Sequence, residues 1–152
     1  MIDRSASAAD VLLVEPSDER TRLTSDAFSG GGSTAIHAVS DGDAALAFLE
    51  GRDEYADAPA PCLVVLRLEL PEPGPDGLDV LERTAEQTEL ARIPVVATAD
   101  APDDDVVTEA YVRGANAVLP TPSDPAALTE TMERVAEFWL ATARLPNRTD
   151  RL

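Results

Sequence analysis

Short runs of apolar residues alternate along the chain with longer segments in which apolar residues recur every three or four positions. The short runs have the length of strands that are buried on both faces, and the longer segments have the period of amphipathic helices. Stretches rich in Gly, Pro, Asp and Ser separate the two kinds of segment. The predicted strands are 11–14, 33–39, 62–66, 94–98 and 116–120, and the predicted helices are 17–29, 43–50, 78–90, 103–113 and 123–139.

Five strand–helix units in succession predict a parallel sheet with helices on both of its faces. In such sheets, functional groups gather at the carboxyl ends of the strands. The residues expected at that edge are Glu15, Arg67, Thr98 with Ala99, and Thr121. Arg67 is unusual among them, because it is a cation that directly follows an unbroken apolar strand.

The length of 152 residues favours one domain with a single core. We expect a flexible lead-in at 1–9, a folded domain at 10–145 and a polar tail at 146–152. No apolar run is long enough to span a bilayer, and no charged-then-apolar leader opens the chain. A soluble, cytoplasmic protein with no membrane partner is the expectation.

The charge balance is strongly acidic, with 29 acidic residues against 12 basic ones, all of them arginine, and a net charge of −17. Such a surface repels nucleic acid, so we expect no nucleic-acid partner. The acids are spread along the whole chain, a pattern that suits concentrated salt, where a Debye length of ~3 Å at about 1 M screens self-repulsion. The composition therefore favours a halophilic, salt-loving host.

Candidate catalytic chemistry is sparse. The chain has one cysteine, Cys62, and one histidine, His37, so neither a Cys–His nor a Ser–His–Asp set is apparent, and a cysteine-based zinc site is excluded. The glycines at 30–32 follow no strand and precede no Gly-Lys-Ser/Thr sequence, so a phosphate-binding loop is not indicated. We therefore expect a protein that is not an enzyme and that carries no cofactor.

Several motifs, taken together, point to one family. In chain order they are "VLLVEPSDE", "VSDGDAALAFL", "LELPEPGPDGLDVL", "RGANAVLPTPSDPAAL" and the late "FW". Their order and spacing resemble the receiver domain of two-component response regulators, stand-alone members in particular, over about 10–145. The resemblance implies a flavodoxin-like, doubly wound, five-stranded parallel sheet in the order 2-1-3-4-5 with five helices. It also implies a cis-proline turn at Pro122.

The resemblance assigns roles at the carboxyl edge of the sheet. Receivers accept a phosphoryl group on an aspartate at the end of the third strand, and Arg67 occupies that position here. Where the family has two adjacent acids that hold Mg²⁺, this chain has Glu15 and Pro16, and Glu15 with Glu69 forms a remnant acidic pocket. Arginine is a permanent cation and cannot accept the phosphoryl group.

The family's switch and phosphate-contact positions are altered too. Thr121 stands where receivers carry a lysine, and Val118 stands where they carry an aromatic residue. Thr98 or Ala99 fills the hydroxyl position on the fourth strand. These departures favour a pseudo-receiver that keeps the fold and loses phosphotransfer, with Mg²⁺ binding lost or weak, because Mg²⁺ needs near-octahedral oxygen ligands.

Three alternatives stay open for the site. A working phosphoacceptor could be Glu69 or Asp76, although Asp76 belongs to the Asp-Gly turn that starts a helix. The site could also be a decayed and inert receiver site. In a sharper version, Arg67 and Glu15 form an ion pair that locks one conformation.

The expected output is contact with other proteins, such as a histidine kinase or another signalling protein, because the chain has no room for an output domain. Homodimer formation is a further option. In the last helix, Phe138 and Trp139 lie about 100° apart, so both can hardly point inward. We expect at least one of them to be exposed or covered by a second subunit or another protein.

Overall fold

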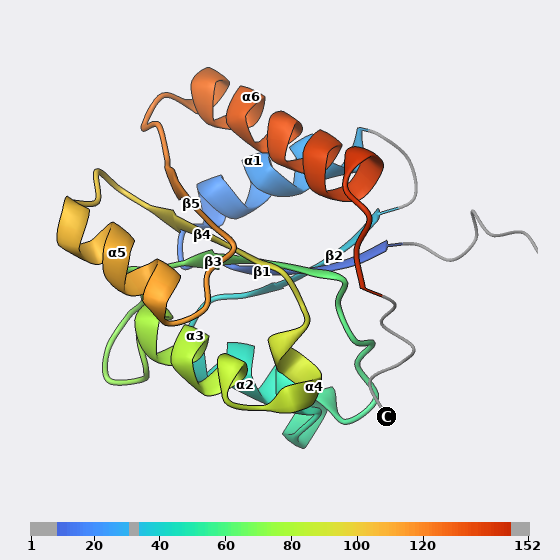
Figure 1. Ribbon diagram of the computed structural model, residues 1–152. Helices are drawn as coiled ribbons and strands as arrows, with labels where there is room; N and C mark the ends of the chain where they lie inside the picture. Colours follow the sequence, from blue (N-terminus) through green and yellow to red (C-terminus); the bar gives the residue numbers. More distant parts are fainter. Residues whose placement is uncertain (1–8, 31–33, 147–152) are drawn as a thin grey trace, which may run out of the picture.

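The computed structural model describes residues 9–30 and 34–146, and places five parallel strands in one sheet of order β2-β1-β3-β4-β5 (Figure 1). The predicted strand order is confirmed. The 1–8 part of the lead-in and the 147–152 part of the tail lie outside the described residues. The strands are β1 (Ala9–Val14), β2 (Thr34–Val39), β3 (Leu63–Arg67), β4 (Val95–Ala99) and β5 (Ala117–Pro120).

Helices cover both faces of the sheet. Figure 1 shows α1 and α6 together on one face, with the other helices on the opposite face. The first face carries α1 (Asp18–Ser29) and α6 (Pro125–Ala136). The second carries α2 (Gly42–Glu50), α3 (Gly77–Ala85), α4 (Thr88–Ala91) and α5 (Asp104–Val112), with a short 3-10 turn at Asp53–Tyr55.

Two apolar layers hold this arrangement together, one on each face of the sheet. Alternate residues of β1 and β3 enter opposite layers, because successive side chains of a strand point to opposite faces. Leu63 and Val65 pack with α1 and α6, whereas Val64 and Leu66 pack with the helices of the other face. Arg67 is the next residue in the first series, so its side chain lies on the α1/α6 face.

The prediction of five helices is wrong in one segment, because the expected helix 78–90 is two helices, α3 and α4. Gln87 has extended backbone angles between them. Thr84 is the last buried residue of α3, and the next buried residue is Leu90 in α4. The Gln87 side chain donates instead to the Glu50 carboxylate at 2.8 Å, which ties this break to α2.

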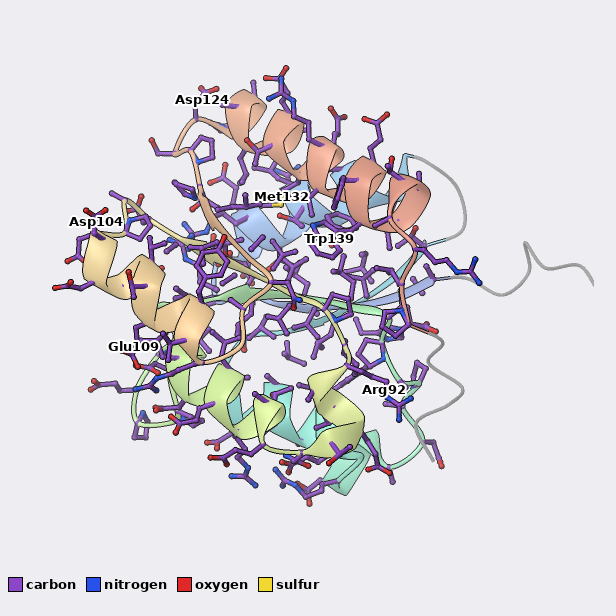
Figure 2. All side chains as sticks on the ribbon, in the orientation of Figure 1. Arg92, Asp104, Glu109, Asp124, Met132 and Trp139 are labelled. Carbon is purple, nitrogen blue, oxygen red and sulfur yellow. The ribbon has the colours of Figure 1, made fainter. Side chains whose placement is uncertain are left out.

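The last helix carries the predicted apolar stripe and then changes its pitch. Leu128, Met132 and Val135 are buried against the sheet, as expected. A π-helical segment, η3 (Glu137–Thr142), continues the helix and contains Phe138 and Trp139. Figure 2 shows Met132 and Trp139 on the side of this helix that faces the sheet.

Two further findings bear on the predictions. Among the described residues the cis peptide bond is Glu72–Pro73, so the implied cis bond before Pro122 is wrong. Within 9–30 and 34–146, none of the helices has the length and apolar character needed to cross a bilayer.

Candidate functional site

Arg67 lies at the carboxyl end of the central strand β3, opposite Thr98 of β4 in the register of the sheet. Both side chains are buried, with 5% of Arg67 and 3% of Thr98 exposed. Paired residues of neighbouring strands point to the same face, so Thr98 shares the α1/α6 face with Arg67. Ala99 is buried in the layer on the other face. Of the two candidate hydroxyl positions, it is therefore Thr98 that lies beside Arg67.

The Arg67 guanidinium has two partners. Its Nη1 donates to Thr121 Oγ1 at 2.6 Å. Its Nε lies 2.9 Å from Glu69 Oε1, although the buried N–H does not point along a hydrogen bond, so that contact is an ion pair. The cation is thus held by the residue just past β5 and by a carboxylate two positions further along its own strand end.

Thr121 joins three strand ends. Its hydroxyl donates to the Ala99 carbonyl at 3.0 Å while it accepts from Arg67, and its backbone N–H donates to the same carbonyl at 2.9 Å. Pro120 has no N–H of its own to donate. The carboxyl ends of β3, β4 and β5 are therefore linked through one threonine side chain.

Glu15 directly follows β1 and is 8% exposed. Its Oε2 accepts from the Ser17 backbone N–H at 2.9 Å and lies 3.0 Å from Arg20 Nη2, in the first turn of α1. The expected ion pair between Arg67 and Glu15 is therefore wrong. Each charge is paired with a residue close to it in sequence: Glu15 pairs with Arg20, and Arg67 pairs with Glu69.

The two alternative acceptor acids are also engaged. Glu69 Oε1 faces Arg67, and its Oε2 accepts from the Asp100 backbone N–H at 3.2 Å. Asp76 is the N-cap of α3, where it accepts from Asp79 N at 3.0 Å and Asp79 returns the bond to the Asp76 N–H. The structural interpretation of Asp76 as a helix-starting residue is confirmed.

The strand end beside Arg67 also requires a glycine. A Cβ on Gly77 would lie 2.5 Å from Leu68 Cα and 2.6 Å from the Arg67 carbonyl oxygen, distances that real Cβ atoms do not show. The Gly77 N–H donates to the Leu68 carbonyl at 3.0 Å. The start of α3 is thereby packed directly against the chain that carries Arg67.

The residues of this edge do not fit a divalent cation. A magnesium site in a protein is usually built from carboxylates and water. Here Glu15 and Glu69 each face a guanidinium, and Pro16 offers no side-chain oxygen. Within the described part of the chain, no three His, Cys, Asp or Glu side chains are grouped so as to hold a metal ion.

The last switch position lies away from this cluster. Val118 of β5 is half-buried and packs against the layer formed with the helices on the opposite face from α1 and α6. Its backbone N–H donates to the Tyr111 hydroxyl at 3.2 Å. The structure thus brings together Arg67, Glu69, Thr98 and Thr121, whereas Val118 belongs to another layer.

The predicted partner-contact residues behave as their spacing indicates. Phe138 is 52% exposed, and Trp139 is half-buried against the α1/α6 layer. The two rings meet edge to face, with centroids 5.3 Å apart. The prediction that both cannot point inward is confirmed.

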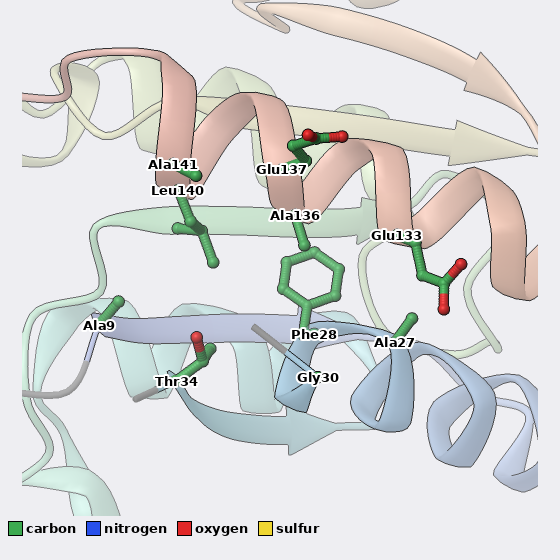
Figure 3. Close-up of a pocket in the computed structure, with 10 residues that line it drawn as sticks. All are labelled: Ala9, Ala27, Phe28, Gly30, Thr34, Glu133, Ala136, Glu137, Leu140 and Ala141. Atoms are coloured by element: carbon green, nitrogen blue, oxygen red, sulfur yellow. The ribbon is translucent and has the colours of Figure 1, made fainter. Parts of the chain in front are cut away.

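A cavity of about 510 Å³ lies between the end of α1, the starts of β1 and β2, and the last helix. Figure 3 shows Phe28 of α1 and Leu140 of η3 pointing into the space between the last helix and the sheet. Glu133 and Glu137 also line it. The last helix therefore lines the cavity with both apolar and acidic residues, namely Ala136, Leu140 and Ala141 beside Glu133 and Glu137.

A second ionic cluster, on the opposite face, joins α2 to α3. Arg52 donates to Glu50 at 2.7 Å, and Arg83 Nε donates to the same carboxylate at 3.1 Å. Burial raises the pKa of Glu50, but the hydrogen bonds from Arg52 and Gln87 and the positive charge of Arg83 outweigh burial and hold that pKa below 4.5. The ionised carboxylate is the form that the fold favours.

Comparisons with known proteins identify the class to which this fold and this strand edge belong. The chain is 34% identical over 149 residues to the response regulator Rcp1 of Synechocystis sp., with 96% of this chain and 99% of the relative covered. Among solved structures, the phosphorylated cyanobacterial phytochrome response regulator RcpA superposes with a TM-score of 0.87 at 31% identity, covering 92% of this chain and 99% of that one. The Mn²⁺-bound form of Rcp1 gives a TM-score of 0.86 at 32% identity, covering 91% and 99%. No family model matches the sequence. The chain belongs to the receiver family of two-component response regulators.

Proposed function

We propose that this receiver is a pseudo-receiver, in which Arg67 occupies the phosphoacceptor position and signalling proceeds by protein contact without phosphotransfer. The observation that carries the proposal is the Arg67 guanidinium itself, buried at the end of β3 and bonded to Thr121 at 2.6 Å. A guanidinium stays protonated and offers only donors, so it cannot form an acyl phosphate.

The neighbouring groups support the same proposal. A relative is known in a phosphorylated form and another in a Mn²⁺-bound form. In this chain the two acids nearest to Arg67 and β1 are already paired with arginines, at 2.9 and 3.0 Å. A metal ion would have to displace those pairs, so we propose that Mg²⁺ binding is lost or weak and that the protein is neither an enzyme nor dependent on a cofactor.

The test is phosphorylation with acetyl phosphate and Mg²⁺, followed by intact-protein mass spectrometry, and binding of beryllofluoride. We expect no mass increase and no beryllofluoride complex. An adduct of roughly 80 Da, one phosphoryl group, would reject the proposal. Peptide mapping of that adduct to Glu69 or Asp76 would establish the alternative acceptor instead.

We further propose that the exposed Phe138 is a contact for another protein, either a signalling partner or a second copy of the chain. A half-exposed phenyl ring beside a half-buried indole is the kind of residue that interfaces use. Phe138→Glu should weaken self-association or partner binding and leave folding intact. Val112→Glu is the matched control, because Val112 is 76% exposed and lies on α5.

The readout is solution mass at high salt, together with co-purification from the native host, for the parent and both variants. Equal behaviour of all three, with a strictly monomeric parent and no co-purified protein, would show that Phe138 only caps the core. We also propose a cytoplasmic location and adaptation to concentrated salt, from the charge of −17.

A further inference from the structure

The cavity of about 510 Å³ under the last helix lies at the amino edge of the sheet, at the other ends of the strands from Arg67. Figure 3 shows Ala9 and Thr34 at the starts of β1 and β2, with the last helix across the cavity from them. An inference about this cavity therefore goes beyond the proposed function, and it does not depend on whether the edge with Arg67 accepts a phosphoryl group.

The wall that the last helix forms changes its pitch within the cavity. Ala136 belongs to α6, whereas Leu140 and Ala141 belong to the π-helical segment η3. Turns of π-helix are rare and occur frequently at functional sites. The buried ring of Phe28, from the last turn of α1, completes the apolar part of the lining. The lining thus presents aliphatic and aromatic carbon to an occupant.

The same helix also gives the cavity a negative charge. Glu133 and Glu137 line the cavity, and both residues are exposed. The basic residue between them, Arg134, lies 3.4 Å from a different acid, Glu130. A fitting occupant therefore brings an apolar side chain for the lining and a positive charge for the two glutamates.

The segment 1–8 of this chain has both of these features. Its sequence is MIDRSASA, with two large apolar residues, Met1 and Ile2, and one basic residue, Arg4. Its single acid, Asp3, balances Arg4, so the side chains of the segment carry no net charge, whereas the whole chain carries −17. The segment can therefore approach the glutamates without adding the repulsion that other parts of the chain would bring.

The segment 1–8 also joins the fold at the cavity, because the residue that follows it, Ala9, is part of the cavity wall. A sphere of 510 Å³ is about 10 Å across, and the five steps from Arg4 to Ala9 span up to ~17 Å when extended. Arg4 can therefore cross the cavity to the last helix. A tether this short gives an effective concentration on the order of mM, against which a second copy, with its own charge of −17, would have to compete.

We propose that residues 1–8 dock in this cavity within the same molecule, with Ile2 against the apolar lining and Arg4 paired with the glutamates of the last helix. The docking is noncovalent and reversible. It joins the start of β1 to the last helix, two elements from opposite ends of the sequence. The segment acts as an intramolecular cover, which another protein would have to displace to reach this surface.

The experiment is NMR of the isotope-labelled full chain at low protein concentration. The expected result is a set of NOEs from the methyl groups of Ile2 to Phe28 and Leu140. Mixing labelled with unlabelled protein separates the two possible sources of the segment. NOEs between copies would show that a second molecule fills the cavity and would overturn the proposal, as would the absence of any NOE between 1–8 and the cavity.

Charge exchange tests the pairing. Arg4→Glu should lower the equilibrium constant for docking about fivefold, read from NOE intensities, because an attraction becomes a repulsion. Adding Glu133→Arg together with Glu137→Arg should restore it. The matched control adds Glu89→Arg with Glu130→Arg instead, two exposed glutamates outside the cavity wall, and should restore nothing. Restoration by both pairs alike would show a general effect of net charge and reject the pairing.

A change without charge tests the apolar contact. Ile2→Ser should shift the backbone signals of Ala136, Leu140 and Ala141 in the same direction as Arg4→Glu does, because both changes release the segment. Ile2 and Arg4 lie outside the sheet and its two apolar layers, so we expect both variants to fold. Cavity signals that respond to neither substitution would show that this segment is not the occupant.

Discussion

The two arginine–carboxylate pairs of the strand edge should contribute unequally to stability, and the difference can be worked out from exposure. Removing Arg20 leaves Glu15, a carboxylate that is 8% exposed, with one backbone hydrogen bond. Removing Arg67 leaves Glu69, whose side chain is 54% exposed and can return to water. The carboxylate that stays buried is the costly one, so Arg20→Met should destabilise the fold more than Arg67→Met.

The magnitudes follow from the same contacts. Removing one partner of a buried ion pair costs about 3–5 kcal/mol. The Arg20 side chain is 34% exposed, so water can partly replace it, and we expect Arg20→Met to cost about 2–3 kcal/mol. Arg67→Met loses a charge-assisted bond to Thr121 but relieves the burial of a cation, so about 0–1 kcal/mol is expected.

The assay is urea unfolding at fixed salt, monitored by the fluorescence of Trp139, the single tryptophan. The urea concentration at the midpoint of unfolding should fall. The slope of the free energy of unfolding against urea concentration should change little, because the surface exposed on unfolding is the same. At about 2–4 °C per kcal/mol, the melting temperature of Arg20→Met should fall by roughly 4–12 °C. A double variant, Glu15→Gln with Arg20→Met, should regain a large part of the loss, since no unpaired charge is left.

Two results would refute this reasoning. The first is an Arg67→Met variant that loses as much stability as Arg20→Met, or more. The second is a double variant as unstable as Arg20→Met alone, which would show that the cost does not come from the Glu15 charge.

Three other predictions follow from the contacts described. Gly77→Ala should lose on the order of 1–3 kcal/mol through overpacking, measured by thermal unfolding, whereas Gly30→Ala, with its nearest atom 3.9 Å away, should lose nothing. The pKa of Glu50 is held below 4.5, so its ionised form stabilises the fold at neutral pH and that contribution is lost as the pH falls below about 4.5. The stability advantage of the parent over Glu50→Gln should therefore shrink as the pH falls below about 4.5, and a constant difference would contradict the linkage. Raising the salt from about 0.1 M to about 1 M should raise the melting temperature through screening of the −17 charge, and a fall over that range would contradict the proposed salt adaptation.

The centre of the sheet could be predicted from the sequence because β1, β3 and β4 are largely buried and appear as apolar runs, whereas the edge strands β2 and β5 are only partly buried. The break after Ala85 could not, because the charged and polar residues there are compatible with a continuous helix. At the break Gln87 has extended backbone angles, and its side chain bonds to Glu50 of another helix. Such a contact joins residues that are far apart in the sequence.

The sequence placed Arg67, Thr98 and Thr121 at one edge of the sheet, where the structure has them, but it did not give the ion pairs of that edge. The sequence places Glu15 and Arg67 at adjacent strand ends, which favours a pair between them. Arg20 was missed, although a signal was available, because it lies three residues after the N-cap Ser17, in the turn directly above the end of β1. Which arginine reaches Glu15 depends on side-chain direction, and the order of residues does not give it.

The Thr121 side chain has a consequence for any path back to a phosphorylatable site. Arg67→Asp would place a new carboxylate near Glu69, and the hydroxyl that now serves Arg67 would still be committed to the Ala99 carbonyl. Glu15 would stay bound to Arg20, and Pro16 would still provide no second acid. Thr121 and Arg67 therefore depend on each other, and a single substitution of Arg67 leaves the other positions of the edge unchanged. If phosphotransfer is lost at this edge, as proposed above, several simultaneous substitutions would be needed to restore it.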